Sequence, residues 1–194
     1  MPSVYALKPA FQNLLRPLVR RMAAWGVTPN QVTVISCVLS VLLGWELTFG
    51  SRPWILLPVF LPFRMALNAI DGMLAREHNQ QTRLGAMLNE LTDVVSDAAL
   101  TLPLAYVDGV KPLGVGVAIF FAALTEMAGV LDRVGRRYDG PFGKSDRALV
   151  LGVLGAWLAL GWPIAAGWLL WLPGLWILLC VVTIANRMRG VEAR

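Results

Sequence analysis

Residues 64–97 read RMALNAIDGMLAREHNQQTRLGAMLNELTDVVSD, and this stretch decides how the chain must fold. It consists of two apolar segments that contain charged and amide side chains and are joined by a short polar connection at about residues 77–83. Polar side chains inside a membrane-spanning helix cost free energy unless they are paired or hydrated, so each of them marks a candidate functional site. The stretch therefore predicts a hairpin of two spanning helices that share a polar surface.

The polar and small residues of the two segments recur three or four positions apart, so each set shares one helix face. They are Arg64, Asn68, Asp71 and Ala75 on the first segment, and Gly85, Asn89, Asp93 and Asp97 on the second. Counting outward from the connection by helix rise predicts four pairs at equal depth. The pairs are Ala75 with Gly85, Asp71 with Asn89, Asn68 with Asp93, and Arg64 with Asp97. Two carboxylates and two amides thus surround one polar pocket.

Arg64 has several candidate partners. A buried ion pair with Asp97, one turn deeper than Asp93, is the preferred interpretation. Alternatively, Arg64 reaches a phosphate of the substrate, or it pairs with Glu46 of the preceding apolar segment.

The composition of the whole chain indicates a membrane protein. Of its 194 residues 57% are apolar and only 15% are charged, and the mean hydropathy is +0.62, whereas about a quarter of a soluble domain is charged. Six stretches are long and apolar enough to cross a bilayer, at about 31–49, 54–75, 84–107, 113–131, 147–161 and 163–186. We therefore expect an all-α membrane protein with one domain, residues 1–194, whose six transmembrane helices occupy about 31–186.

Residues 3–25 show a different pattern, with apolar residues on one helical face and cations on another. This predicts an amphipathic interfacial helix on the cytoplasmic leaflet, in contact with membrane lipids. A secretory signal peptide is the alternative, but no small-residue cleavage site follows and five more spans do. Fourteen of the seventeen Lys and Arg residues fall on one side if the N-terminus is inside. The positive-inside rule then predicts a multi-pass protein of the bacterial inner membrane, with both termini and the polar pocket cytoplasmic.

A pocket of carboxylate and amide oxygens that faces the cytoplasm suits Mg²⁺, which usually serves substrate phosphates. The alternative is that these residues only join helices, but four polar residues in register beside Gly72, Ala75 and Gly85 favour a site. A transporter would more often show internal repeats or broken helices, and a scaffold would not need this array. Nucleic-acid binding is not expected, because the membrane face accounts for the net charge of +5.

Residues 68–93 carry a specific resemblance. They read N-x2-D-G-x2-A-R-x8-G-x3-N-x3-D. The stretch resembles the motif D-x2-D-G-x2-A-R-x8-G-x3-D-x3-D of the CDP-alcohol phosphatidyltransferases, with every spacing kept and six of eight fixed positions matched. The family is also similar in its six spans, its amphipathic N-terminal helix and its Thr-Pro-Asn opening to the first span, here Thr28-Pro29-Asn30.

The resemblance implies transfer of a phosphatidyl group from CDP-diacylglycerol, or another CDP-alcohol, to the hydroxyl of a small acceptor alcohol, with release of CMP. Asp93 would be the base, and Gly72, Ala75, Arg76 and Gly85 would shape the site of the CDP moiety. One or two Mg²⁺ or Mn²⁺ ions would be held by residues at the four acidic motif positions, here Asp71, Asp93, Asn68 and Asn89. A homodimer is expected by the same resemblance.

Asn68 and Asn89 depart from the motif, since the family has Asp at both positions. Their amides lower the formal charge of the four positions from −4 to −2, so two cations would be held more weakly, or one alone would bind. Three interpretations stay open, in this order: an active enzyme with altered metal use, an enzyme whose substrate brings extra negative charge, and a catalytically impaired protein that binds without turnover.

Residues 133–147, RVGRRYDGPFGKSDR, form a second informative segment. Its G-P-x-G-K-x-D-R run, residues 140–147, resembles the acceptor-side segment of family members whose acceptor carries a phosphate. Arg137, Lys144 and Arg147 are therefore candidates for binding an anionic acceptor or the lipid phosphate, and Glu126 could line the same cavity. The alternative is a positive-inside loop against lipid headgroups. The identity of the acceptor cannot be read from the sequence.

Overall fold

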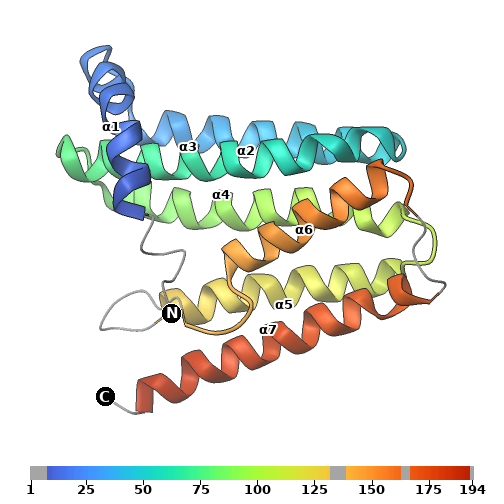
Figure 1. The fold of residues 1–194 in the computed structure, drawn as a ribbon. Coiled ribbons are helices and arrows are strands. Elements are labelled where there is room, and N and C mark those ends of the chain that lie inside the picture. Colours follow the sequence, from blue (N-terminus) through green and yellow to red (C-terminus); the bar gives the residue numbers. More distant parts are fainter. Residues whose placement is uncertain (1–7, 132–138, 163–166, 193–194) are drawn as a thin grey trace. The chain divides into compact units, whose positions relative to one another are not determined.

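The structure, a computed structural model, describes residues 8–131, 139–162 and 167–192, and every regular element in these ranges is helical (Figure 1). The longer helices are α1 (Lys8–Ala24), α2 (Pro29–Glu46), α3 (Leu57–Glu77), α4 (Arg83–Thr101), α5 (Pro112–Val130), α6 (Lys144–Ala159) and α7 (Trp168–Glu192). Short 3-10 turns connect some of them: η2 (Leu47–Phe49), η3 (Arg52–Leu56) and η4 (Leu102–Tyr106). The predicted all-α class is confirmed.

The chain divides into two compact units. The first comprises Met1–Ser40 and Pro62–Ser96, and the second comprises Val41–Leu61 and Asp97–Arg194. Their boundaries fall inside α2, α3 and α4, so each of these helices contributes one end to each unit.

In the first unit α2, α3 and α4 run side by side, and α1 crosses them (Figure 1). Val19 of α1 is fully buried against Val32 of α2 and against Ile70, Met73 and Leu74 of α3. Burial of such side chains contributes roughly 1.5–3 kcal/mol each to stability. This cluster therefore holds the amphipathic α1 against the end of α3.

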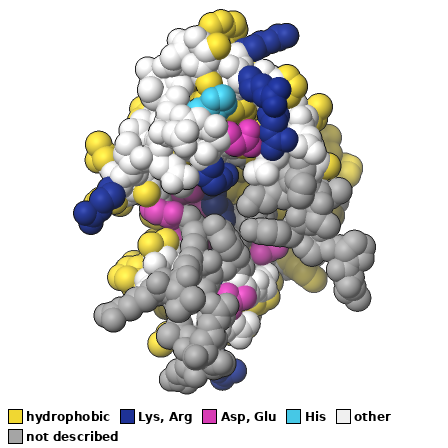
Figure 2. Space-filling model, turned by 90° about the vertical axis from the view of Figure 1, so that its left-hand side faces the viewer, with side chains coloured by type: hydrophobic (Ala, Val, Ile, Leu, Met, Phe, Trp, Pro, Cys, Tyr) yellow, Lys and Arg dark blue, Asp and Glu magenta, His cyan; other side chains and the backbone are white. Residues whose placement is uncertain are grey.

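An ion pair links the same two helices. The Arg16 guanidinium donates to both carboxylate oxygens of Glu77, over 3.0 and 3.1 Å. This hydrogen bond raises the pKa of Arg16 above its ordinary value, so the group stays charged. Charged side chains of both signs lie together on this end of the first unit, flanked by apolar ones (Figure 2).

In the second unit α5 and α7 pack side by side (Figure 1), and α6 lies against η3. Phe142 and Trp176 meet edge to face, with ring centroids 5.0 Å apart. Gly155 of α6 lies so close to α3 that a Cβ there would come within 2.9 Å of Leu57. This close approach explains why a residue without a side chain occupies that position.

Four helices of the described residues are long and apolar enough to cross a membrane: Pro29–Phe49, Arg52–Glu77, Pro112–Val130 and Trp168–Arg189. The other two predicted spans correspond to α4 and α6. Helix α4 has more charged residues than an apolar span tolerates, and α6 has 16 residues. The multi-pass character is therefore supported, whereas the count of six spans and the interfacial place of α1 remain predictions.

Candidate active site

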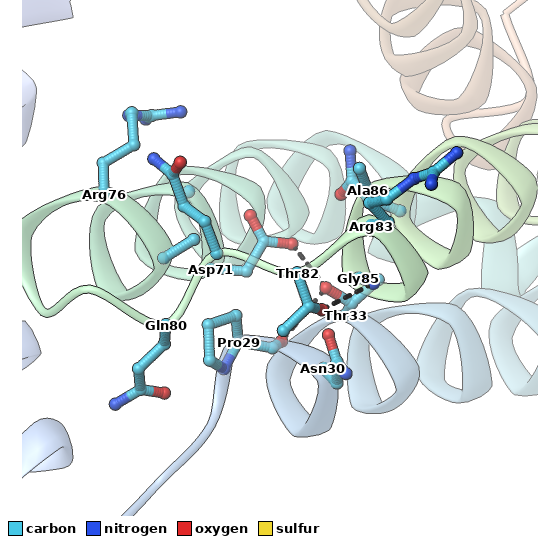
Figure 3. A pocket seen from close by; sticks show the side chains of 14 residues that line it. Pro29, Asn30, Thr33, Asp71, Arg76, Gln80, Thr82, Arg83, Gly85 and Ala86 are labelled. Atoms are coloured by element: carbon cyan, nitrogen blue, oxygen red, sulfur yellow. Dashed lines mark hydrogen bonds between the residues drawn. The ribbon is translucent and has the colours of Figure 1, made fainter.

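A cavity of about 540 Å³ opens in the first unit, between the start of α2, the end of α3 and the start of α4 (Figure 3). Six of the eight motif positions line it: Asp71, Gly72, Ala75, Arg76, Gly85 and Asn89. Pro29, Asn30 and Thr33 of α2 line it as well. Residues that the sequence predicted to form one pocket are thus brought together.

Asp71 is the buried carboxylate of this cavity, with 6% of its surface exposed. The Thr33 hydroxyl lies 2.8 Å from its Oδ2 and 3.0 Å from the carbonyl oxygen of Pro29. A hydroxyl has one proton to donate, and the charged, nearer acceptor gains more from it. Thr33 therefore holds one oxygen of Asp71, as the dashed line in Figure 3 shows.

Sequence reasoning missed this role of α2. Thr33, Ser36 and Ser40 are spaced by three and four residues in an apolar helix, and all three are buried. A hydroxyl stripe of this kind is a signal for contacts with a polar neighbouring helix.

The two remaining motif positions, Asn68 and Asp93, contact each other. Asn68 Nδ2 donates to Asp93 Oδ1 over 3.1 Å, which confirms the predicted pairing of these residues at equal depth. Ser36 donates to Asn68 Oδ1 over 3.4 Å. The amide is therefore held from both sides.

Arg64 also contacts Asp93. Its Nη2 lies 3.4 Å from Asp93 Oδ1 and 3.3 Å from the carbonyl oxygen of the same residue. Asp97 in turn lies 3.3 Å from Nη2 of Arg147. Asp93 and Asp97 are one turn apart on a shared face, which is why helix rise alone did not single out Asp93. The expected Arg64–Asp97 and Arg64–Glu46 pairs would join the two units and stay predictions.

Gly85 leaves room for neighbouring side chains. A Cβ there would lie 2.7 Å from Asn30 Oδ1 and 2.9 Å from Thr82 Oγ1, and its N–H donates to that Thr82 oxygen over 2.9 Å. Thr82 thus caps the start of α4. A Cβ at Gly72 would lie 2.8 Å from Nη2 of Arg76. Both glycines allow polar groups to approach the helix surface at the rim of the cavity.

The three residues predicted to bind the acceptor lie in different environments. Arg137 lies outside the described residues, and Lys144 begins α6 with its side chain partly exposed. Arg147 is buried in the second unit, where it donates to Glu126 over 2.8 Å and to Asp97 over 3.3 Å. Thr125 Oγ1 also accepts from it, over 2.9 Å. The structure thus joins Arg147 and Glu126, and a role of either in acceptor binding stays a prediction.

The donor set suits a hard divalent cation. Asp71 and Asn89 both line the cavity, and Mg²⁺ is usually bound through one or two carboxylates together with substrate phosphates. In the described part of the chain no three His, Cys, Asp or Glu side chains cluster as a metal cage.

Comparisons with known proteins find similarity along most of the chain. Residues 26–180 match the family model described as CDP-alcohol phosphatidyltransferase. The chain is 44% identical to the inner membrane protein YnbA of Escherichia coli (strain K12), over 97% of this chain and 96% of that protein. It is 27% identical to the phosphatidylinositol phosphate synthase of Mycobacterium tuberculosis (strain H37Rv), over 94% and 87% of the two chains.

Solved structures show the same fold. The crystal structure of the Mycobacterium tuberculosis phosphatidylinositol phosphate synthase with CDP-DAG bound aligns with a TM-score of 0.71, at 20% identity, over 90% of this chain and 92% of that chain. A second crystal structure, in complex with manganese and citrate, gives a TM-score of 0.72 at the same identity, over 91% and 88%.

Proposed function

Because this chain belongs to the CDP-alcohol phosphatidyltransferase family, we propose that the cavity around Asp71 is the site that binds the CDP moiety of its lipid donor. The enzyme transfers a substituted phosphoryl group from a CDP-alcohol to an acceptor alcohol in phospholipid synthesis, and CMP leaves. One observation supports the placement best. Six motif positions that are dispersed between residues 71 and 89 line a single cavity of about 540 Å³.

In the proposed reaction the acceptor oxygen forms a bond to the phosphorus that carries the lipid. The bond from that phosphorus to the CMP phosphate oxygen breaks, and CMP leaves with the electron pair. Asp93 takes the acceptor proton, for which Asn68 and Arg64 orient its carboxylate. Gly72, Ala75, Arg76 and Gly85 shape the place of the nucleotide.

Asp71 and Asn89 would hold Mg²⁺ or Mn²⁺ at the diphosphate, with Asn68 and Asp93 as the further predicted ligands. The bound cation would neutralise charge on the leaving diphosphate. The crystal structure of the Mycobacterium tuberculosis relative in complex with manganese supports this choice of ion.

The acceptor would be a small alcohol, with or without its own phosphate. Arg137, Lys144 and Arg147 would face it or the lipid phosphate. We further propose six transmembrane helices with α1 on the cytoplasmic leaflet, both termini and the site on the cytoplasmic side, and a homodimer. The similarity to an Escherichia coli inner membrane protein supports the same membrane in a bacterium.

The test is release of CMP by purified protein from radiolabelled CDP-diacylglycerol, with Mg²⁺ or Mn²⁺ and a panel of alcohols. Asp71→Asn and Asp93→Asn should each lower kcat about a hundredfold or more, because they remove a cation ligand and the base. Thr48→Ala on η2, which is not among the residues that line the cavity, is the control. The proposal would be refuted if no CMP were released with either metal and any alcohol, and if Asp71→Asn bound CDP as well as the unaltered protein does. An impaired binder or a transporter would then be the better interpretation.

A further inference from the structure

We infer that Asn68 is a positioning residue that holds Asp93 by a hydrogen bond, and that this chain binds a single divalent cation at Asp71 and Asn89. The inference rests on the proposed function and narrows it, because it revises the expected ligand role of Asn68 and the number of ions.

The amide of Asn68 is oriented by its neighbours. Its Nδ2 faces Asp93 Oδ1 at 3.1 Å. The reverse orientation would set the amide oxygen against a carboxylate oxygen, and neither of these atoms has a proton to donate. Oδ1 therefore points to the other side, where it accepts from Ser36 over 3.4 Å. The oxygen that would have to bind a cation is directed at a hydroxyl of α2.

Arg64 supplies positive charge at the same carboxylate. Its guanidinium is buried, with 4% of the residue exposed, and its Nη2 lies 3.4 Å from Asp93 Oδ1. Two like charges a few ångströms apart in a buried site repel strongly. A cation on Asp93 Oδ1 would lie beside this guanidinium and would have to displace the Asn68 amide as well.

Asparagine at position 68 fits these contacts better than aspartate would. An aspartate there would place a second carboxylate about 3 Å from Asp93, and a bridging cation would be needed to hold the two together. Asparagine has the same shape and replaces that bridge by a direct N–H···O bond. The four acidic motif positions thus separate into two pairs. Asn68 and Asp93 are hydrogen-bonded to each other, and Asp71 and Asn89 line the cavity.

The cavity-lining pair keeps the features of a cation site. Asp71 brings one carboxylate, Asn89 lines the same cavity, and Thr33 holds Asp71 Oδ2 at 2.8 Å. One carboxylate with substrate phosphates is a common set of ligands for one Mg²⁺ or Mn²⁺ ion.

The decisive measurement is the number of Mn²⁺ ions bound per chain. Full-length protein in detergent would be equilibrated with Mn²⁺ and CDP, and bound and free Mn²⁺ would be separated by dialysis and counted. We expect one ion in the unaltered protein, one in Asn68→Ala and two in Asn68→Asp, which restores a second adjacent carboxylate. Two ions in the unaltered protein, fewer than one in Asn68→Ala, or one in Asn68→Asp would overturn the inference.

A kinetic measurement tests the positioning role separately. Asn68→Ala should lower kcat about ten- to a hundredfold with the KM for CDP-diacylglycerol unchanged, because a lost supporting hydrogen bond misorients the base. Ser36→Ala, which leaves the Asn68–Asp93 bond intact, should have a smaller effect on kcat. A rise in KM with kcat unchanged in Asn68→Ala would contradict the role. The Mn²⁺ count does not require turnover. A protein that binds one Mn²⁺ ion but shows no activity would therefore refute the proposed function and leave the inferred number of ions standing.

Discussion

The carboxylate that lines the cavity is contacted by a hydroxyl of α2. Thr33 Oγ1 lies 2.8 Å from Asp71 Oδ2, and both residues are buried. If Asp71 binds the cation as proposed, Thr33 fixes its direction, and the loss of such a supporting group typically costs about ten- to a hundredfold in affinity or activity. Thr33→Val keeps the shape of the side chain and removes the donor.

We expect Thr33→Val to raise the Mn²⁺ concentration for half-maximal CMP release about tenfold or more. Thr33→Ser retains the hydroxyl and should stay within about threefold of the unaltered protein, since the hydrogen bond is kept. Equal Mn²⁺ dependence in the valine and serine variants would show that the hydroxyl does not hold Asp71 in the active state.

At the scale of helices, Gly85 sets how closely the start of α2 approaches α4. Gly85→Ala would place a Cβ 2.7 Å from Asn30 Oδ1 and 2.9 Å from Thr82 Oγ1. Both atoms end side chains that can turn aside, so the cost should lie at the lower end of the about 1–3 kcal/mol that is typical of overpacking. We therefore expect a lower thermal unfolding temperature in detergent, together with weaker CDP binding, because these residues line the cavity.

Gly116→Ala is the matched control for this change. Gly116 lies inside α5, and a Cβ there would meet no heavy atom within 4 Å. Alanine in place of glycine in a helix interior gains roughly 0.5–1 kcal/mol. The control should therefore unfold at the same or a slightly higher temperature, and equal losses in both variants would contradict the packing argument.

Helices α4, α5 and α6 are tied together by one buried cation in the second unit. Arg147 of α6 contacts Glu126 of α5 over 2.8 Å and Asp97 of α4 over 3.3 Å. Removal of one partner from such a cluster leaves buried charge uncompensated, which costs about 3–5 kcal/mol. Arg147→Met should therefore lower the free energy of unfolding by that amount in a denaturant titration.

Two further variants separate charge from packing. The exposed Arg189 of α7 is a suitable control, and Arg189→Met should change stability by less than about 1 kcal/mol. Combining Arg147→Met with Asp97→Asn and Glu126→Gln should recover much of the loss, because the unpaired charges are gone. No recovery in the triple variant would mean that Arg147 contributes by packing instead.

The sequence predicts some contacts between helices and not others, and the difference has a physical reason. Helical periodicity and helix rise suffice to place Asn68 opposite Asp93, since both depend on distances along one hairpin. The contacts of Thr33 with Asp71 and of Arg147 with Glu126 also join consecutive helices, but longer connections separate α2 from α3 and α5 from α6 than separate α3 from α4. Helix rise counted outward from a short connection therefore does not give their depth or their rotation. The sequence therefore identified Arg147 and expected Glu126 in the same cavity, but it did not predict their ion pair, and it assigned Asp97 to Arg64.

For the whole molecule, the number of membrane crossings is the open structural question. Hydropathy selects four helices among the described residues, whereas the sequence pattern predicts six spans. The difference lies in α4 and α6. Helix α4 carries several charged and amide side chains, and α6 has only 16 residues. A site that requires charge inside a span makes that span look less apolar, so a hydropathy threshold misses it.

The two counts differ in where residue 108 lies. With the N-terminus inside and six spans, α4 crosses the membrane and Asp108 faces outward, while a helix α4 that does not cross leaves Asp108 in the cytoplasm. Asp108 is exposed, as are Ser51 and Gln81, so single cysteines at these positions should be accessible to a reagent. The native Cys37 and Cys180 lie in helices and would first be replaced by alanine.

We expect a membrane-impermeant maleimide applied to intact cells stripped of their outer membrane to label Ser51→Cys and Asp108→Cys, and to label Gln81→Cys only after the membrane is opened. Ser51 and Gln81 flank α3, which crosses by either count, so they calibrate the two sides. Protection of Asp108→Cys together with labelling of Ser51→Cys would mean that α4 stays on the cytoplasmic side. The six-span arrangement would then be wrong, even though α4 carries Asn89 and Asp93 of the motif.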